Sequence, residues 1–159
     1  MTMEPSFEKL LVLLAESGVR FLVIGGVSVG IQGYLRLTED LDLLLEDSGE
    51  NIQLLLATLA GYGEGFAREL SAEDFTDEEG AIRVVEESEQ MQIDLFTRMR
   101  GQRFADAIAD ADRFQVGEHA IAVASKTSLI GWKEDSQREK ERLDAIALRR
   151  LRHNPHAFD

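Results

Sequence analysis

The chain has 159 residues, carries a formal net charge of −13 and contains no cysteine. The lack of cysteine excludes disulfides, thiolate metal sites and a cysteine nucleophile. No apolar run approaches the roughly 20 residues that a membrane-spanning helix needs. With 44% hydrophobic and 30% charged residues, the composition indicates a soluble globular protein, which we expect to be cytoplasmic and without a membrane partner. The negative charge disfavours a protein that grips nucleic acid through its phosphates, although the C-terminal stretch "KERLDAIALRRLRH" is locally basic.

Apolar periodicity and glycine positions predict the first four elements of the chain. Residues 6–17 place apolar side chains at helical spacing and are followed by Gly18, which predicts an amphipathic helix with a glycine stop. The β-branched and aromatic run 19–25 is bounded by glycine and predicts a buried strand. The glycine-rich stretch 26–34 is expected to open a short helix, and residues 39–46 to form the next strand.

The rest of the chain continues in mixed order and ends in helices. A short link at 88–89 indicates an antiparallel hairpin, and Ser125 suits the N-cap of the helix that follows it. The expected elements are a helix over 51–63, strands over 81–87 and 90–98, a helix over 103–110, two short strands within 113–125, and helices over 126–136 and 138–152. This order predicts one α+β (mixed α/β) domain over residues 1–159. Its small mixed β-sheet, flanked by helices, would occupy about 6–124, and a C-terminal helical segment about 125–152.

Two aspartates one residue apart, Asp40 and Asp42, stand among leucines in the stretch "EDLDLLLE". Side chains alternate across a strand, so both carboxylates share one face while Leu41 and Leu43 point into the core from the other. Burying two carboxylates without partners would cost several kcal/mol, so a cation is expected beside them. Arg36 is one candidate, and a hard divalent cation such as Mg²⁺ is the other.

A glycine turn precedes these acids in the chain. Gly25 and Gly26 follow the strand that ends in "VIG" and would let the backbone approach a ligand closely. A helix that starts there would aim free N–H groups at a phosphate, and Ser28 could add a hydroxyl donor. The alternative is a tight turn that needs glycine for steric reasons only.

A third acid, Asp94, lies inside the apolar strand "QIDLF". If that strand neighbours the strand of Asp40 and Asp42, three carboxylates converge and would repel one another unless cations bind. Two divalent ions at such a site can clamp the attacking and leaving oxygens of a phosphoryl displacement. The alternative is an edge strand that turns Asp94 toward water.

Together these residues resemble the signature of the nucleotidyltransferase superfamily with the polymerase-β-like fold. The similarity is greatest to small bacterial members, including AbiEii-type toxins and minimal nucleotidyltransferases. It rests on "GGVSVGIQGYLRLTEDLDLLL", with Arg36 and Thr38 ahead of the acids, on Asp94 in "QIDLF", and on the later segment "SLIGWKEDSQREKERLDAIAL". It covers the chain from about residue 6 to 151.

The resemblance implies transfer of a nucleoside monophosphate from an NTP to an acceptor hydroxyl, with Mg²⁺ or Mn²⁺ as cofactor and release of pyrophosphate. Asp40, Asp42 and Asp94 would bind the metal ions, and Asp94 would also help to activate the acceptor. The residues that would contact the nucleotide are Gly25, Gly26, Ser28, Arg36 and Lys133, although Lys133 could equally be a plain surface lysine.

Several alternatives stay open at this point. The chain could be a non-catalytic binding protein of the same fold, for example in a toxin–antitoxin pair with an antitoxin-like partner, or a nuclease or another two-metal phosphotransferase. Dinucleotide binding is disfavoured because "GGVSVG" lacks the second glycine of G-x-G-x-x-G. The net charge mildly favours a small-molecule acceptor, or a protein or tRNA end that meets the basic C-terminal helix. Trp132 could stack on a base or belong to the core.

Overall fold

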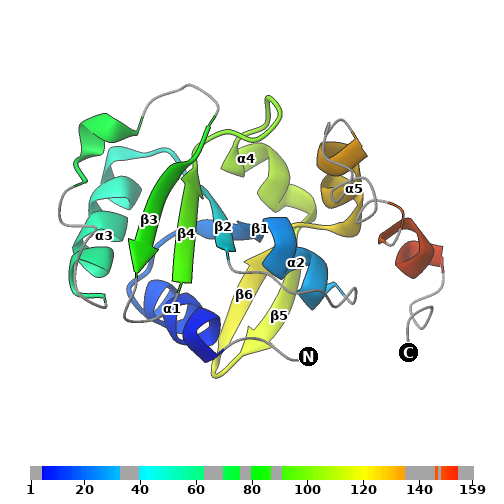
Figure 1. Cartoon of the computed structure of the whole chain (residues 1–159), viewed down its shortest axis with the longest axis horizontal. Coiled ribbons are helices and arrows are strands. Elements are labelled where there is room, and N and C mark those ends of the chain that lie inside the picture. The colour runs from blue at the N-terminus through cyan, green and yellow to red at the C-terminus, as the bar shows by residue number, and fades with distance from the viewer. Residues whose placement is uncertain are drawn as a thin grey trace.

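A computed structural model describes residues 5–32, 40–62, 70–75, 80–86, 91–134, 146 and 148–153 of the chain. Within these residues, a six-stranded mixed β-sheet runs through the centre of the molecule with helices on both faces (Figure 1). The predicted α+β class is therefore confirmed. In the part of the chain so described, no helix is long and apolar enough to cross a membrane.

The sheet has the strand order β3-β4-β2-β1-β6-β5. Its two outer pairs, β3–β4 and β5–β6, are antiparallel, as is the central pair β1–β2, whereas β2 pairs with β4 and β1 with β6 in parallel. All six strands correspond to predicted ones, and the predicted hairpin is the β3–β4 pair. The strands are β1 (Phe21–Ile24), β2 (Asp40–Leu45), β3 (Ile82–Glu86), β4 (Met91–Phe96), β5 (Asp112–Val116) and β6 (His119–Val123).

The helices also follow the predictions, with one difference. The expected helix over 103–110 is a single α-helical turn followed by a 3₁₀ turn, because Ala111 is already extended and β5 begins directly after it. Residues 146 and 148–153 are helical, which extends one residue beyond the C-terminal helix predicted over 138–152. The labelled elements are α1 (Pro5–Glu16), α2 (Gly25–Ile31), α3 (Gly49–Ala60), α4 (Phe104–Ala107), α5 (Lys126–Glu134), and the 3₁₀ turns η2 (Ala72–Asp74) and η3 (Ile108–Asp110).

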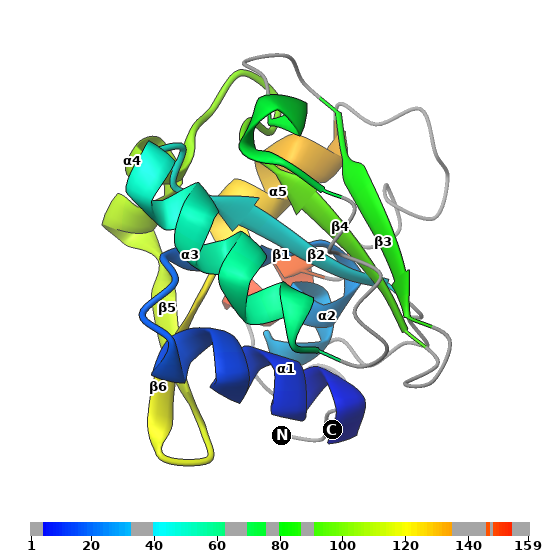
Figure 2. The same ribbon diagram turned by 90° about the vertical axis from the view of Figure 1, so that its left-hand side faces the viewer.

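Two apolar layers cover the two faces of the sheet. Figure 2 shows α1 and α3 on the near side of the strands and α5 on the far side. Leu10 and Leu14 of α1 and Leu55 of α3 belong to the first layer. The second layer joins α4, α5 and the C-terminal helix through buried side chains that include Phe104, Leu129, Trp132 and Leu148.

The alternation of β2 decides which face carries its acids. Leu41, Leu43 and Leu45 are buried in the layer of α1 and α3, as the sequence predicted for the first two. Leu44 packs in the opposite layer, with α4 and α5. Asp40 and Asp42 have the same parity as Leu44, so they lie on the face of α4 and α5.

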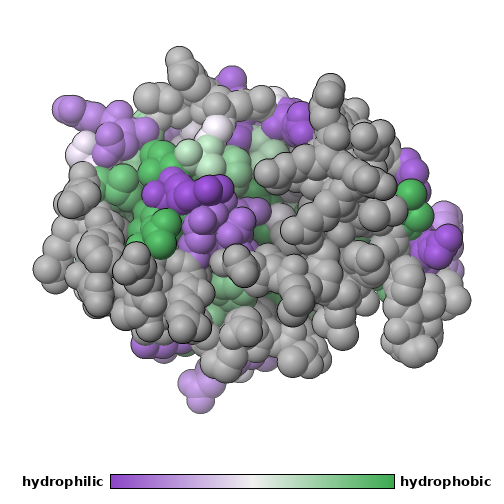
Figure 3. All heavy atoms as spheres, in the orientation of Figure 1, coloured by the Kyte–Doolittle hydropathy of each residue, from purple (hydrophilic) through white to green (hydrophobic). Residues whose placement is uncertain are grey.

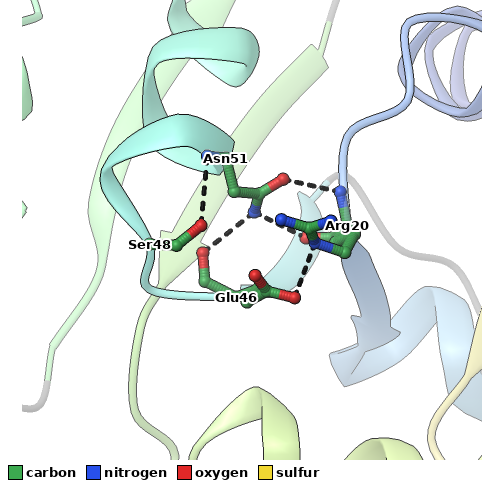
Figure 4. A network of polar contacts seen from close by, with 4 residues as sticks. All are labelled: Arg20, Glu46, Ser48 and Asn51. Atoms are coloured by element: carbon green, nitrogen blue, oxygen red, sulfur yellow. Dashed lines mark hydrogen bonds and ion pairs between the residues drawn. The ribbon is translucent and has the colours of Figure 1, made fainter.

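A buried asparagine ties the start of α3 to the strands β1 and β2. The Oδ1 atom of Asn51 accepts from the backbone N–H of Arg20 at 2.7 Å, and its Nδ2 atom donates to the carbonyls of Arg20 and Glu46, both at 2.9 Å (Figure 4). Ser48 caps the helix by accepting from the backbone N–H of Asn51. These bonds fix the C-terminal end of β2, whereas Asp40 and Asp42 lie at its N-terminal end.

Candidate active site

The structure brings the three predicted acids to one place. β2 and β4 are parallel neighbours, and their register sets Asp42 beside Asp94 and Asp40 beside Gln92. Neighbouring strands lie about 4.8 Å apart, so Asp42 and Asp94 are adjacent on the α4 and α5 face. Asp94 is only 5% exposed and is not turned to water. The sequence predicts that the three carboxylates converge if the strand of Asp94 neighbours the strand of Asp40 and Asp42. The pairing of β2 with β4 meets this condition.

A pocket of about 270 Å³ opens over these acids. Its polar lining residues include Asp40, Asp42, Asp94, Arg83 and Arg100. Figure 3 shows hydrophilic side chains gathered next to hydrophobic ones over β3 and β4. Its apolar lining residues include Ile24, Phe96, Met99, Leu129 and Trp132.

Gly25 lies against the carboxylate of Asp42. Its φ angle is +70°, in the region that favours glycine, and a Cβ atom there would fall 2.0 Å from Oδ2 of Asp42. The structure thus gives Gly25 a steric reason, the contact with Asp42, which agrees with the alternative of a turn that needs glycine for steric reasons. Ser28 is fully buried, and its hydroxyl donates to the carbonyl oxygen of Gly25 at 2.6 Å. Gly26 lies in the first turn of α2, and the nucleotide contacts expected of these three residues stay predictions.

Asp94 is paired with an arginine that the sequence reasoning missed. Nε of Arg83 lies 3.1 Å from Oδ1 of Asp94, and its Nη2 atom lies 3.5 Å from Oδ2. The side chain of Gln92 also donates to Oδ2, at 3.5 Å. The bond to Asp94 raises the pKa of Arg83 above its usual value, with smaller contributions from the charges of Asp94, Asp40 and Asp42. Among the described residues, Arg83 is therefore the cation that is paired with Asp94.

The signal for Arg83 is present in the sequence. An antiparallel hairpin with its turn at 88–89 places residue 83 opposite residue 94, and this is the register that β3 and β4 adopt. An opposite-charge pair directly across two strands is stabilising. Arg36, the arginine expected beside the acids, lies outside the described residues. Lys133 is in α5, but its side chain lies outside the described part.

A second arginine, Arg100, reaches the pocket from a tight turn. Met99 and Gln102 exchange backbone hydrogen bonds of 2.8 and 2.9 Å, and Arg100 between them has a φ angle of +49°. Trp132 donates from Nε1 to the side chain of Gln102 at 3.2 Å, which anchors the turn on α5. Trp132 is 9% exposed and belongs to the second apolar layer, so its core interpretation holds although it also lines the pocket.

The donor set fits a hard divalent cation in its chemistry. Asp40, Asp42 and Asp94 offer carboxylate oxygens, the ligands that Mg²⁺ and Mn²⁺ prefer. The glycine at position 25 lets the carboxylate of Asp42 lie directly against the backbone, where any other side chain would clash with it. Across the residues that the structure describes, no group of three or more His, Asp and Glu side chains is arranged as a complete metal site. In the structure, the carboxylate of Asp94 is instead ion-paired with Arg83.

Comparison with protein families matches residues 5–155 to the family described as "Nucleotidyl transferase of unknown function (DUF2204)". The chain belongs to this family. The resemblance to nucleotidyltransferases drawn from the aspartates and glycines is thereby confirmed, while the AbiEii-type subgroup stays a prediction. A comparison with curated proteins finds no match.

Solved structures of nucleotidyltransferases share the fold. The lincosamide antibiotic adenylyltransferase LnuA, in its lincomycin-bound crystal structure, superposes with a TM-score of 0.64 at 15% identity, over 93% of this chain and 97% of that one. An antigenic nucleotidyltransferase-like protein from Paracoccidioides brasiliensis gives a TM-score of 0.56 at 14% identity, over 91% and 73%. At such identities the likeness shows the nucleotidyltransferase fold alone.

Proposed function

We propose that this member of the nucleotidyl transferase family moves a nucleoside monophosphate from an NTP to an acceptor hydroxyl, with a divalent metal ion as cofactor. The observation that supports the proposal is the position of Asp42 and Asp94 on adjacent parallel strands, with Asp40 on the same face, at the wall of one pocket. A purely structural site has no need of three acids on one face, because like charges repel at this spacing.

The roles of the residues follow from their positions. Asp40, Asp42 and Asp94 would hold Mg²⁺ or Mn²⁺, which when bound stabilises charge on the attacking and leaving oxygens. Asp94 would accept the proton of the acceptor hydroxyl as a general base. The acceptor oxygen then forms a bond to the α-phosphorus, the bond from that phosphorus to the bridging oxygen breaks, and pyrophosphate leaves.

The acceptor that we propose is a small molecule with an apolar body. Five large apolar side chains line the pocket, and the net charge of −13 opposes a long nucleic-acid acceptor. The structural neighbour LnuA is named for adenylyl transfer to lincosamide antibiotics. A protein or a tRNA end is the alternative acceptor.

A second candidate function is a non-catalytic binding role of the same fold, as in a toxin–antitoxin pair. The observation that favours it is the ion pair between Arg83 and Asp94, which satisfies the most buried of the three acids without a metal ion. Such a protein would not respond to Mg²⁺ and NTP together.

Thermal unfolding with Mg²⁺ and NTP separates the two functions. A ligand at 100 times its Kd adds about 2.7 kcal/mol to the free energy of unfolding, so the catalytic candidate should melt at a higher temperature with both present. Incubation with Mg²⁺, each labelled NTP and cell extract should then transfer label to a product. Asp40→Asn and Asp42→Asn should abolish this transfer. Glu118→Gln, a matched charge removal at the exposed β5–β6 turn, should not. Transfer retained in both Asp variants would reject the proposal.

A further inference from the structure

The ion pair at the pocket joins a buried acid to an exposed base. Asp94 lies on β4, inside the sheet, and its side chain is 8% exposed, while the side chain of Arg83, on the outer strand β3, is 60% exposed. The guanidinium therefore covers the carboxylate from the solvent side. A long exposed side chain at the rim of a sheet can leave such a contact by rotation of its own bonds, without disturbing the apolar layers.

Arg83 and a divalent cation would compete for the same carboxylate. Arg83 donates to both oxygens of Asp94, and its positive charge would repel a metal ion bound there. An arginine side chain does not lose its proton in proteins, so it can make room for a cation only by moving.

A guanidinium that leaves Asp94 would still lie beside the pocket. Arg83 and Arg100 both line it, together with the acids. A triphosphate in this pocket would place phosphate oxygens within the reach of a displaced Arg83, and guanidinium groups bind phosphate through two parallel hydrogen bonds. The movement thus exchanges one anionic partner for another of higher charge.

We infer that Arg83 is a built-in counter-cation, which holds Asp94 until a divalent cation binds and then moves to the phosphates of the nucleotide. This inference rests on the proposed function and assigns to it a residue that both restrains metal binding and assists nucleotide binding. It gives a directional expectation: removal of the charge at position 83 should strengthen metal binding without nucleotide and weaken nucleotide binding with metal.

The test measures Mn²⁺ binding to the full chain by electron paramagnetic resonance, first without nucleotide. Arg83→Gln should bind Mn²⁺ about tenfold more tightly than the wild type, the size of effect that groups next to metal ligands commonly exert. Arg83→Lys keeps the charge without the planar fork and should lie between the two. Arg20→Gln is the matched control, because Arg20 is also half-exposed and pairs with Glu46 at 2.6 Å away from the pocket. Its Mn²⁺ affinity should equal that of the wild type.

The second measurement is the affinity of a non-hydrolysable NTP analogue at saturating Mn²⁺. Arg83→Gln should lose about tenfold in this affinity, since a phosphate contact to a charged group is removed. Equal or weaker Mn²⁺ binding by Arg83→Gln, or an unchanged affinity for the analogue, overturns the inference while the proposed function stands. Failure of every variant and of the wild type to bind Mn²⁺, even with the analogue, overturns both. Circular dichroism of each variant verifies that a changed affinity does not come from unfolding.

Discussion

Gly25→Ala is the substitution that most directly tests the geometry of the pocket. The residue has a φ angle of +70°, and an added Cβ would lie 2.0 Å from Oδ2, 2.8 Å from Cγ and 2.9 Å from Cβ of Asp42. Real Cβ atoms essentially never come closer than 3.0 Å to another heavy atom. The carboxylate of Asp42 must therefore move away by about 1 Å, and a misplacement of that size at a reacting centre can cost about a hundredfold in rate.

The loss of stability has two parts. A left-handed backbone costs a non-glycine residue about 1–2 kcal/mol, and forcing the Asp42 side chain off its rotamer costs about 0.5–1.5 kcal/mol. We expect Gly25→Ala to lower the free energy of unfolding by about 1.5–3.5 kcal/mol. Urea denaturation, followed through the fluorescence of the single tryptophan, which is the buried Trp132, measures this quantity.

Gly117→Ala is the matched control. Gly117 has a φ angle of +59°, and its added Cβ would meet only the side chain of Val12 at an ordinary 3.6 Å. It should cost about 1–2 kcal/mol through the backbone alone and leave Mn²⁺ affinity and turnover unchanged. In an Asp42→Gly background, where the three clashing atoms are gone, Gly25→Ala should cost no more than this control. If Gly25→Ala costs as little as Gly117→Ala in the wild-type background and keeps full Mn²⁺ affinity, the reasoning about Asp42 is wrong.

The remaining predictions concern the acids, the far face of the sheet and the metal ion. Asp42→Asn should abolish nucleotidyl transfer and leave the melting temperature unchanged or higher, because repulsion between carboxylates is reduced; a large loss of stability would count against converging charges. Asn51→Ala should lower the free energy of unfolding by about 2–4 kcal/mol, since it removes the side-chain partner of the backbone N–H of Arg20 and of the carbonyl of Glu46, while the Arg20 carbonyl keeps the N–H of Glu46. Mn²⁺ affinity should not change, as urea titration and resonance spectra would show. Removal of divalent ions with a chelator should abolish binding of an NTP analogue in a filter or calorimetric assay, whereas binding that persists would contradict a metal-dependent nucleotide site.

The strands and most helices could be predicted because each carries a local pattern. β2 alternates so regularly that the core positions of Leu41 and Leu43 followed from period alone. The helix expected over 103–110 is α-helical only to Ala107 and continues as a 3₁₀ turn. Local apolar spacing does not reveal that the chain must become extended at Ala111 to enter β5.

The order of the strands could not be derived from local pattern, since it depends on pairings between distant segments. That β1 lies between β2 and β6, and β4 beside β2, is set by tertiary packing. The same non-local register decides what Gly25 approaches. Ile24 pairs with Asp42, so the next residue, Gly25, lies against the carboxylate of Asp42. The sequence suggests that Gly25 contacts a ligand, whereas in the structure it contacts this aspartate.

The charge of the pocket links these observations to the chemistry. Its lining carries three aspartates and two arginines, so it is net negative before any ligand arrives. An NTP brings several further negative charges and would be repelled by the acids, even with Arg83 and Arg100 nearby. Divalent cations reverse this balance, because they attract both the carboxylates and the phosphates. Arg83 balances part of the charge in the structure without ligands. The pocket that remains is still negative, so under the proposed function it would favour metal ions together with nucleotide over nucleotide alone.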